Sequence, residues 1–280
     1  MNIIVVGGSL AGLFAGIALK RLGHDVHILE RNSEPFLQDQ GAGIVAGTET
    51  RDYMGTFDKC RRDFVVESVF RHYLDIQGNE IHREDWSQYM TSWDLVYYIL
   101  RSNFDGIENE YCKVPDQAGG KTIYDYDANV TNMKVENGEV TLFYEQENRK
   151  KSIKGDVLIA ADGASSSIRA LLYPDLERKY AGYIAWRGTI LESELSEPVA
   201  SALVERFTFF HAPGTQILSY IIPAFIGIFD DEIDSPETVK CLEIRKFDTY
   251  KNFDFNFDQL LAPKAKVLTH LQIDRIGTFT

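Results

Sequence analysis

The sequence has little cysteine. Its three cysteines, Cys60, Cys112 and Cys241, lie far apart and are odd in number. This excludes a disulfide framework that pairs every cysteine, and it is typical of free thiols in a reducing compartment. The chain also lacks a basic N-terminal segment followed by a long apolar run, and no run approaches the ~18 apolar residues of a membrane helix. We therefore expect no signal peptide, no transmembrane segment and a cytoplasmic location.

Positive charge is scarce as well. The chain has 29 Lys and Arg against 42 Asp and Glu, which gives a formal net charge of -13. This acidity, with no basic stripe, argues against nucleic acid or an anionic membrane as the main partner. His24 and His27 span a turn and a strand without a third ligand nearby, so no metal site is predicted. The length of 280 residues and the apolar fraction of 44% are those of a globular protein with one large or two smaller domains.

The first thirty residues show a strand–helix–strand pattern. The continuous apolar run Ile3–Val6 is typical of a strand buried on both faces of a parallel sheet. Apolar residues at helical spacing follow from Leu10 to Ala18. A second strand is predicted over residues 26–29, with Glu30 at its end. Such a βαβ unit, within roughly 30 residues, predicts an α/β fold.

The turn between the first strand and the helix is rich in glycine. It reads Gly7-Gly8-Ser9-Leu10-Ala11-Gly12, which departs from the G-x-G-x-x-G fingerprint by placing Ser9 at the second glycine. Gly7 permits the tight turn, Gly12 lets the helix pack close to the strand, and the helix N-terminus offers N–H groups to a pyrophosphate. Glu30, at the end of the second strand, can accept hydrogen bonds from a ribose. The unit predicts a dinucleotide site without deciding between NAD and FAD.

The same turn has two other interpretations. The glycines can form a purely structural turn. Alternatively, Gly7-x-Ser9-x-Ala11 differs by one methyl group from the G-x-S-x-G nucleophile elbow, in which Ser9 would be the nucleophile of a hydrolase. An elbow serine normally follows several strands, and a hydrolase has no need for Glu30. The dinucleotide interpretation is therefore preferred.

A second turn favours FAD over NAD. Residues 156–161 form another buried-strand pattern, which ends in Asp162-Gly163-Ala164-Ser165, and a helix is predicted from Ser167 to Leu172. Taken alone, this is a common strand–turn–helix with a serine cap. Read with the first motif, it resembles the second fingerprint of flavoprotein monooxygenases, which is matched here by Ala161, Asp162, Gly163, Ser167 and Arg169. This resemblance favours FAD, since an NAD-dependent dehydrogenase would not need Asp162 and Gly163.

Together these motifs resemble those of the FAD-dependent aromatic hydroxylases of the para-hydroxybenzoate hydroxylase type. Within that family the chain is most similar to the dihydroxypyridine hydroxylase branch and its fungal relatives. The resemblance covers roughly residues 1–223, and it is carried by residues 5–13, 29–31, 41–44, 161–163 and 180–188.

The resemblance implies a Rossmann-type FAD-binding domain with an inserted, mostly antiparallel β-sheet substrate domain. The FAD-binding domain is expected to be discontinuous, over residues 1–63 and 84–175, with substrate-domain sheet at 64–83 and 176–230. Residues 231–280 remain an unassigned tail. We further expect Thr91 and Asp94 to cap a helix over Leu95–Phe104. Strands are expected over a hairpin at residues 64–83 and over 179–190, 206–211 and 216–222.

The resemblance also implies roles for individual residues. Candidate cofactor-binding residues are those of the two turns, the end of the second strand and a glycine near the flavin ring: Gly7, Ser9, Leu10, Ala11, Gly12, Glu30, Arg31, Gly43, Asp162 and Gly163. Many members carry an arginine before the predicted helix, where this chain has Ser92. On the substrate sheet, Arg187 and Tyr220 are the candidate catalytic residues; they would pair with or hydrogen-bond to a substrate.

The activity implied is that of an enzyme, an FAD-dependent monooxygenase. NAD(P)H, as co-substrate, reduces FAD, and O₂ supplies the oxygen that is placed on a small aromatic, heteroaromatic or secondary-metabolite substrate. The alternatives are a non-catalytic Rossmann-fold remnant, an NAD-dependent dehydrogenase and the Ser9 hydrolase.

The last part of the chain departs from the family pattern. Members continue well past this length with a third fingerprint, Gly-Asp and further glycines, which is not found here, and the sequence does not align after about Ala224. Residues 253–258 alternate like a half-buried strand. These features lead us to expect a C-terminally truncated chain with weak or absent hydroxylase activity.

Overall fold

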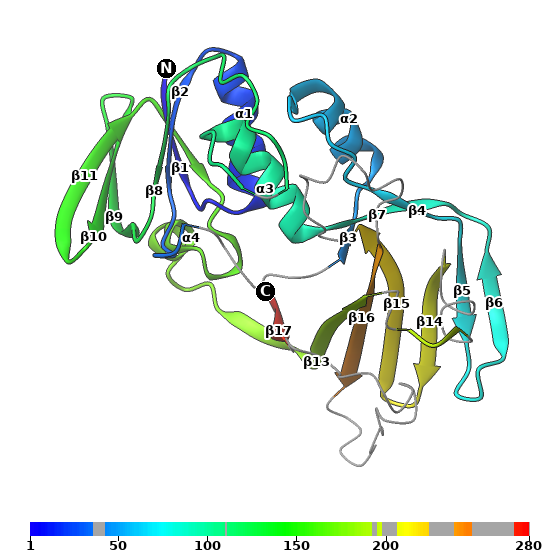
Figure 1. Cartoon of the computed structure of the whole chain (residues 1–280). Helices are drawn as coiled ribbons and strands as arrows, with labels where there is room; N and C mark the ends of the chain where they lie inside the picture. Colours follow the sequence, from blue (N-terminus) through cyan, green and yellow to red (C-terminus); the bar gives the residue numbers. More distant parts are fainter. Residues whose placement is uncertain are drawn as a thin grey trace.

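The computed structural model describes residues 1–35, 43–109, 111–191, 195–197, 206–223, 238–247 and 272–279. It has two parts (Figure 1). One part holds the N-terminus, helices and a parallel sheet, and the other is a large, mostly antiparallel sheet. None of the helices in these residues is long and apolar enough to span a membrane. The predicted fold class, a Rossmann-type domain with a sheet substrate domain, is confirmed.

The parallel sheet is built around the first strand. In the described residues its order is β12-β1-β2-β8, and every neighbouring pair is parallel. Ile3 at the centre lies beside Val26 on one side and Val157 on the other. The three strands predicted for this domain are present and adjacent as β1 (Asn2–Val6), β2 (Asp25–Leu29) and β12 (Val157–Ala160), and β8 (Thr122–Asp125), which the sequence did not predict, pairs with β2. The burial predicted for β12 was wrong: Val157 and Ala160 are exposed, because β12 lies at the edge of this sheet in the described residues.

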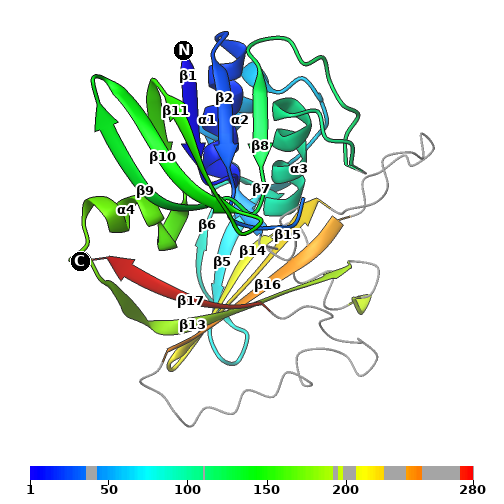
Figure 2. The same cartoon turned by 90° about the vertical axis from the view of Figure 1, so that its left-hand side faces the viewer.

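Alternate residues of β1 pack into two separate hydrophobic cores. Ile3 and Val5 pack with the helices α1 (Leu10–Arg21) and α3 (Trp93–Phe104). Ile4 and Val6 pack on the opposite face with the antiparallel sheet made by β9 (Asn129–Glu136), β10 (Glu139–Gln146) and β11 (Arg149–Gly155). Figure 2 shows this sheet beside the parallel one. Each fully buried side chain of this kind contributes about 1.5–3 kcal/mol, which is why β1 has no polar position between Ile3 and Val6.

The N-terminus of α3 differs from the prediction. Ser92, not Thr91, is the N-cap: its Oγ accepts a hydrogen bond from the Leu95 N–H at 3.3 Å. Thr91 instead donates its hydroxyl to the Phe64 carbonyl. The prediction was wrong by one residue because Ser92 and Thr91 are both good caps, and only the neighbouring chain at Phe64 engages Thr91.

A small sheet joins the two parts. It has the order β3-β7-β4 and consists of β3 (Gly43–Val45), β7 (Gln88–Ser92) and β4 (Val66–Ser68), with α2 (Thr48–Phe57) following β3. From β7, Met90 inserts its side chain into an apolar cluster with Phe207, Leu218, Tyr220 and Ile222 of the large sheet. This cluster fixes how the two parts contact each other.

The large sheet has the order β17-β13-β16-β15-β14-β5-β6 in the described residues, with antiparallel neighbours except for the parallel pair β14 and β5. The predicted hairpin and three later strands are present. Two strands also come from the stretch that the sequence left unassigned, whereas residues 253–258 lie outside the described residues. The strands are β5 (Phe70–Leu74), β6 (Glu80–Glu84), β13 (Arg178–Leu191), β14 (Arg206–Ala212), β15 (Thr215–Pro223), β16 (Thr238–Phe247) and β17 (Gln272–Phe279).

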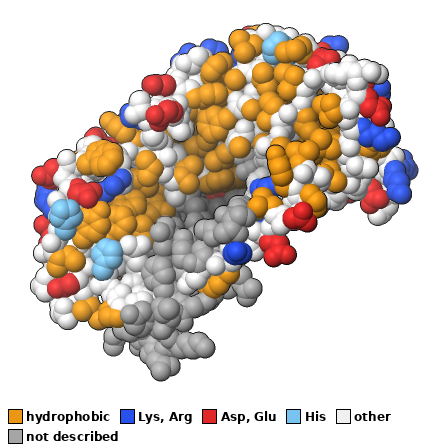
Figure 3. All heavy atoms as spheres, turned by 180° about the vertical axis from the view of Figure 1, so that it is seen from behind, with side chains coloured by type: hydrophobic (Ala, Val, Ile, Leu, Met, Phe, Trp, Pro, Cys, Tyr) orange, Lys and Arg blue, Asp and Glu red, His pale blue; other side chains and the backbone are white. Residues whose placement is uncertain are grey.

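Apolar surface remains exposed on both parts. The space-filling view from behind shows hydrophobic side chains gathered over much of that face (Figure 3). Within the described residues, β12 pairs only with β1, so its outer edge is open. Val157 on this strand is 38% exposed and Leu172, in the helix that follows, is 53% exposed.

Candidate cofactor site

A pocket lies where the parallel strands end. It has a volume of about 680 Å³. Its walls come from the carboxyl ends of β1, β2 and β12, which is where ligands bind in open parallel sheets. The two turns singled out in the sequence, about 150 residues apart in the chain, therefore meet at one site. The lining residues include Gly7, Ser9, Glu30, Arg31, Asn129, Asp162, Gly163 and Ser165.

Two glycines of the first turn are required by close backbone contacts. Gly7 has φ of +101°, and a Cβ there would lie 2.4 Å from the carbonyl oxygen of Ala161. A Cβ on Gly12 would lie 1.9 Å from the carbonyl oxygen of Gly7. Both distances are far below van der Waals contact, so this turn can form only with glycine at these positions.

The N-terminus of α1 opens into the pocket. Ser9 is the N-cap residue, but its side chain accepts no hydrogen bond from the first turn, which is also without acidic residues. Leu10 and Ala11 are the first residues of the helix. A helix N-terminus with free N–H groups and no competing carboxylate is suited to a pyrophosphate. This arrangement, set in a pocket of this size, fits the pyrophosphate of a dinucleotide such as FAD.

Glu30 has two roles in the described structure. It borders the pocket and is only 8% exposed. Its Oε2 accepts a hydrogen bond from the Gly8 N–H at 2.7 Å, and its Oε1 accepts one from the Asn32 N–H at 2.8 Å. The carboxylate thus holds the glycine turn against the end of β2. The next residue, Arg31, is exposed and also lines the pocket.

Asp162 lies on the opposite side of β1 from Glu30, and its carboxylate is directed toward the start of the next helix. Between Asp162 and this helix, α4 (Ser167–Leu172), lies one turn of 3-10 helix, η1 (Gly163–Ser165). The Ser166 hydroxyl donates to Oδ1 at 2.6 Å, and the Ser167 N–H donates to Oδ2 at 2.6 Å. Burial opposes ionisation, but these hydrogen bonds outweigh it and hold the pKa of Asp162 below its ordinary value. The carboxylate is therefore ionised at neutral pH and fixes the turn.

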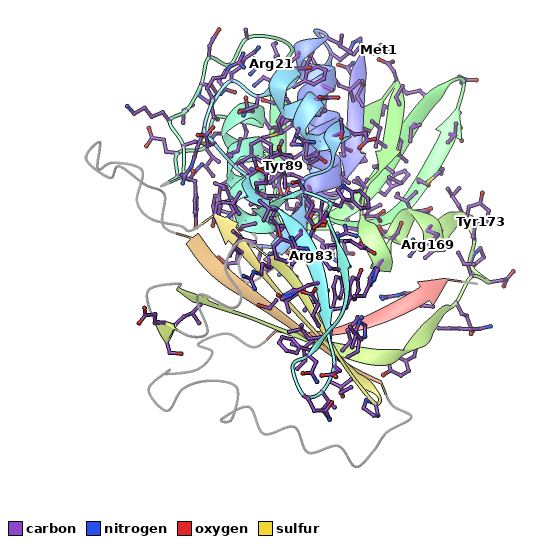
Figure 4. The ribbon with its side chains drawn as sticks, turned by 90° about the vertical axis from the view of Figure 1, so that its right-hand side faces the viewer. Met1, Arg21, Arg83, Tyr89, Arg169 and Tyr173 are labelled. Atoms are coloured by element: carbon purple, nitrogen blue, oxygen red, sulfur yellow. The ribbon has the colours of Figure 1, made fainter. Side chains whose placement is uncertain are left out.

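Gly163 leaves the pocket side of this turn open. Its φ is +67°, and a Cβ there would meet nothing within 4 Å. On the far side of the turn, Arg169 of α4 donates hydrogen bonds to the carbonyls of Gly163 and Ala164. Figure 4 shows Arg169 and Tyr173 at α4, close to the start of β13.

The remaining predicted residues lie at or beyond the junction of the two parts. Tyr220 is 3% exposed, its ring stacks on Phe207 at 5.0 Å, and its hydroxyl donates to the Gly43 carbonyl at 3.0 Å. A Cβ on Gly43 would lie 2.0 Å from the Tyr220 ring, so in this structure the missing side chain makes room for Tyr220. Arg187 lies in β13. The catalytic roles of Arg187 and Tyr220 stay predictions.

Some pocket residues were not found from the sequence. Ala128, Asn129 and Val130 form a wall of the pocket at the start of β9. They belong to no motif, and they reach the site only because β8, which precedes them, pairs with β2. The polar residue of this wall, Asn129, had no spacing signal that distinguished it from other exposed strand residues.

Two family models match the chain. Residues 2–52 match the model described as pyridine nucleotide-disulphide oxidoreductase, which covers the βαβ unit and the first turn. Residues 180–230 match the model described as FAD binding domain-like, which covers the strands from β13 to β15.

Curated relatives match over most of the chain. 2,6-Dihydroxypyridine 3-monooxygenase of Paenarthrobacter nicotinovorans is 28% identical over 227 residues, which are 79% of this chain and 51% of the relative. The FAD-dependent urate hydroxylase of Klebsiella oxytoca is 25% identical over 248 residues, which are 84% of this chain and 58% of the relative. The chain thus spans a little over half the length of these relatives.

Solved structures show the same fold. The 2,6-dihydroxypyridine-3-hydroxylase from Arthrobacter nicotinovorans superposes with a TM-score of 0.70 at 23% identity, over 88% of this chain and 56% of that one. Klebsiella pneumoniae HpxO complexed with FAD and uric acid superposes with a TM-score of 0.66 at 18% identity, over 100% of this chain and 68% of that one. The fold is therefore that of a flavin-dependent monooxygenase. Together with the sequence matches, this supports the resemblance to FAD-dependent aromatic monooxygenases that the motifs predicted.

Proposed function

We propose that this chain binds FAD in the pocket between Glu30 and Asp162 and acts as a monooxygenase on a small aromatic or heteroaromatic substrate, with the weak activity that the sequence leads us to expect. NAD(P)H is the proposed reductant, O₂ the oxidant and the cytoplasm the location, with secondary metabolites among the candidate substrates. We also propose the domain division expected from the sequence, with β16 and β17 added to the substrate sheet.

One observation supports this proposal above the others. The glycine turn of β1, the carboxylate of Glu30 and the turn at Gly163 all line one pocket at the carboxyl ends of parallel strands. An elongated dinucleotide needs separate sites for its ribose and its pyrophosphate. The end of β2 offers a carboxylate for the ribose, and the start of α1 offers N–H groups for the pyrophosphate.

The residues of this chain would bind and orient the cofactor. FAD, when bound, supplies the redox chemistry by which O₂ is used to hydroxylate an aromatic ring. Ser9, Leu10 and Ala11 would hold its pyrophosphate, and Glu30 and Arg31 its adenosine ribose. The turn at Asp162 and Gly163 would provide the opposite wall. The large sheet would carry the substrate, as the resemblance implies.

The site does not favour a hydrolase. A serine nucleophile needs a base within hydrogen-bond reach, most often histidine. No histidine is among the described residues that line the pocket, and Ser9 lies at a helix N-terminus open to an anion.

The proposal is tested by purifying the chain and titrating it with FAD while flavin absorbance and fluorescence are followed. We expect saturable binding with a stoichiometry of one. Oxygen uptake, NADH or NADPH oxidation and product analysis over phenols and hydroxypyridines then test the reaction. Binding of NAD in place of FAD would support a dehydrogenase, and FAD binding without turnover on any substrate would support the non-catalytic alternative.

We predict that Glu30→Ala weakens FAD binding and also lowers the stability of the domain. The substitution removes a charged acceptor from the ribose end and leaves the Gly8 N–H without its partner. Loss of a hydrogen bond to a charged group costs about 1.5–3 kcal/mol, which corresponds to roughly a tenfold to hundredfold higher Kd for FAD. Calorimetric titration and thermal unfolding of the apoprotein measure the two effects separately.

A matched control is Glu34→Ala. Glu34 is exposed and follows Glu30 by four residues, and its carboxylate does not line the pocket. Glu34→Ala should leave the Kd for FAD and the thermal stability of the apoprotein unchanged. An unchanged Kd in Glu30→Ala would remove Glu30 from the cofactor site.

A further inference from the structure

Tyr124 of β8 contacts the glycine turn through its hydroxyl. Its hydroxyl donates a hydrogen bond to the Gly8 carbonyl at 2.9 Å. A Cβ on Gly8 would lie 2.0 Å from the Tyr124 hydroxyl oxygen, so Gly8 is the residue that lets the tyrosine approach. On its other side, the Gly8 N–H donates to Glu30 at 2.7 Å. Gly8 is thus held through both its N–H and its carbonyl.

Tyr124 is itself held by a buried arginine. The Arg101 guanidinium carbon lies 3.9 Å from the centre of the Tyr124 ring, and Arg101 is 0% exposed. Arg101 donates to Asp105 at 2.7 Å, to the Tyr126 hydroxyl at 2.6 Å and to the Pro35 carbonyl at 2.8 Å. The arginine therefore ties α3 to β8 and to the segment that follows Glu30.

The hydroxyl of Tyr124 is a permanent donor. Burial, with a smaller contribution from the neighbouring Tyr97, raises the pKa of Tyr124 well above its ordinary value. The hydroxyl stays protonated through the physiological range. The Gly8 carbonyl is an acceptor only, so the direction of the hydrogen bond is fixed.

We propose that Tyr124, clamped by Arg101, is a positioning residue for the pyrophosphate: through Gly8 it sets the orientation of the turn that precedes α1. This inference rests on the proposed binding of FAD. The turn carries no side chain of its own at Gly7 and Gly8, so only contacts from outside restrict its backbone. A preorganised turn binds an anion more tightly, because the entropy of ordering is not lost on binding.

The test compares Tyr124→Phe with Tyr126→Phe. Each substitution keeps a ring and removes one hydroxyl from the Arg101 cluster, but only the Tyr124 hydroxyl bonds the glycine turn. We expect Tyr124→Phe to raise the Kd for FAD about threefold to tenfold, the fold-change given by the net contribution of one hydrogen bond. Tyr126→Phe should bind FAD like the wild type while showing a similar change in Tm.

The FAD titration is carried out well below the Tm of all three proteins, with circular dichroism as the check of folding. A structural role alone would lower both Tm values and leave both Kd values unchanged. If the wild type binds FAD and Tyr124→Phe binds it with the same Kd, the positioning role is overturned and the proposed function stands. The same holds if the Kd rises equally in both variants. A wild-type protein that binds no FAD overturns the proposed function and this inference with it.

Discussion

Gly12→Ala is expected to abolish stoichiometric FAD binding and to destabilise the domain. The new Cβ would lie 1.9 Å from the carbonyl oxygen of Gly7 and 3.2 Å from Val5. Because the first contact is with backbone, no side-chain rotation relieves it. Either α1 moves away from β1, or the turn between them opens.

Both movements displace the N–H groups at the start of α1 from the pocket. Overpacking in a tight core costs about 1–3 kcal/mol, and occasionally more. Loss of two charge-assisted hydrogen bonds to a pyrophosphate costs about 3–6 kcal/mol in addition. The Kd for FAD should therefore rise by at least about a hundredfold, as measured by fluorescence titration, with a lower Tm in thermal unfolding.

Gly55→Ala is the matched control. Gly55 is also a helical glycine, in α2, but a Cβ there would meet nothing within 4 Å. Alanine should be neutral or stabilise the helix by about 0.5–1 kcal/mol, and FAD binding should not change. Equal effects of the two substitutions would show that helix propensity, not the contact with Gly7, governs the result at Gly12.

The parts of the site that the sequence predicted share one property. Gly7, Gly12, Glu30 and Asp162 each lie a few residues after a short, mostly apolar strand. Local periodicity therefore places each of them at a strand end, and the parallel sheet brings those ends together. The same apolar periodicity correctly predicted the βαβ unit and α4.

The contacts that escaped prediction are those between segments far apart in sequence. Tyr124 lies 116 residues from Gly8, and the pairing of β8 with β2 alone brings them together. The carboxylate of Asp162 was assigned to the cofactor, but in the structure it also caps α4, because Ser166 and Ser167 follow at capping distance. β16 was not predicted because the alternation of its apolar residues changes phase between Cys241 and Leu242.

Arg101 is a further residue that no motif identified, and its substitution is expected to have the largest effect on stability. Its guanidinium is fully buried and forms an ion pair with Asp105 at 2.7 Å. Burial alone would lower the pKa of Arg101, but the hydrogen bonds and charge of Asp105 outweigh it and raise that pKa. Asp105 is the C-cap of α3, where the helix dipole disfavours a negative charge.

We predict that Arg101→Met destabilises the protein by about 3–5 kcal/mol, the range for removing one partner of a buried ion pair. Methionine fills much of the space, so the loss arises from the uncompensated carboxylate and from the Tyr126 hydroxyl and Pro35 carbonyl that lose their donor.

Arg101→Met/Asp105→Leu should recover most of this loss in urea unfolding, because the isolated charge is gone. The exposed pair Lys154–Glu139 gives the contrast: Lys154→Ala should leave the unfolding midpoint unchanged, because exposed ion pairs contribute little. A double variant no more stable than Arg101→Met would show that the hydrogen bonds of Arg101, and not the charge of Asp105, hold α3 to β8.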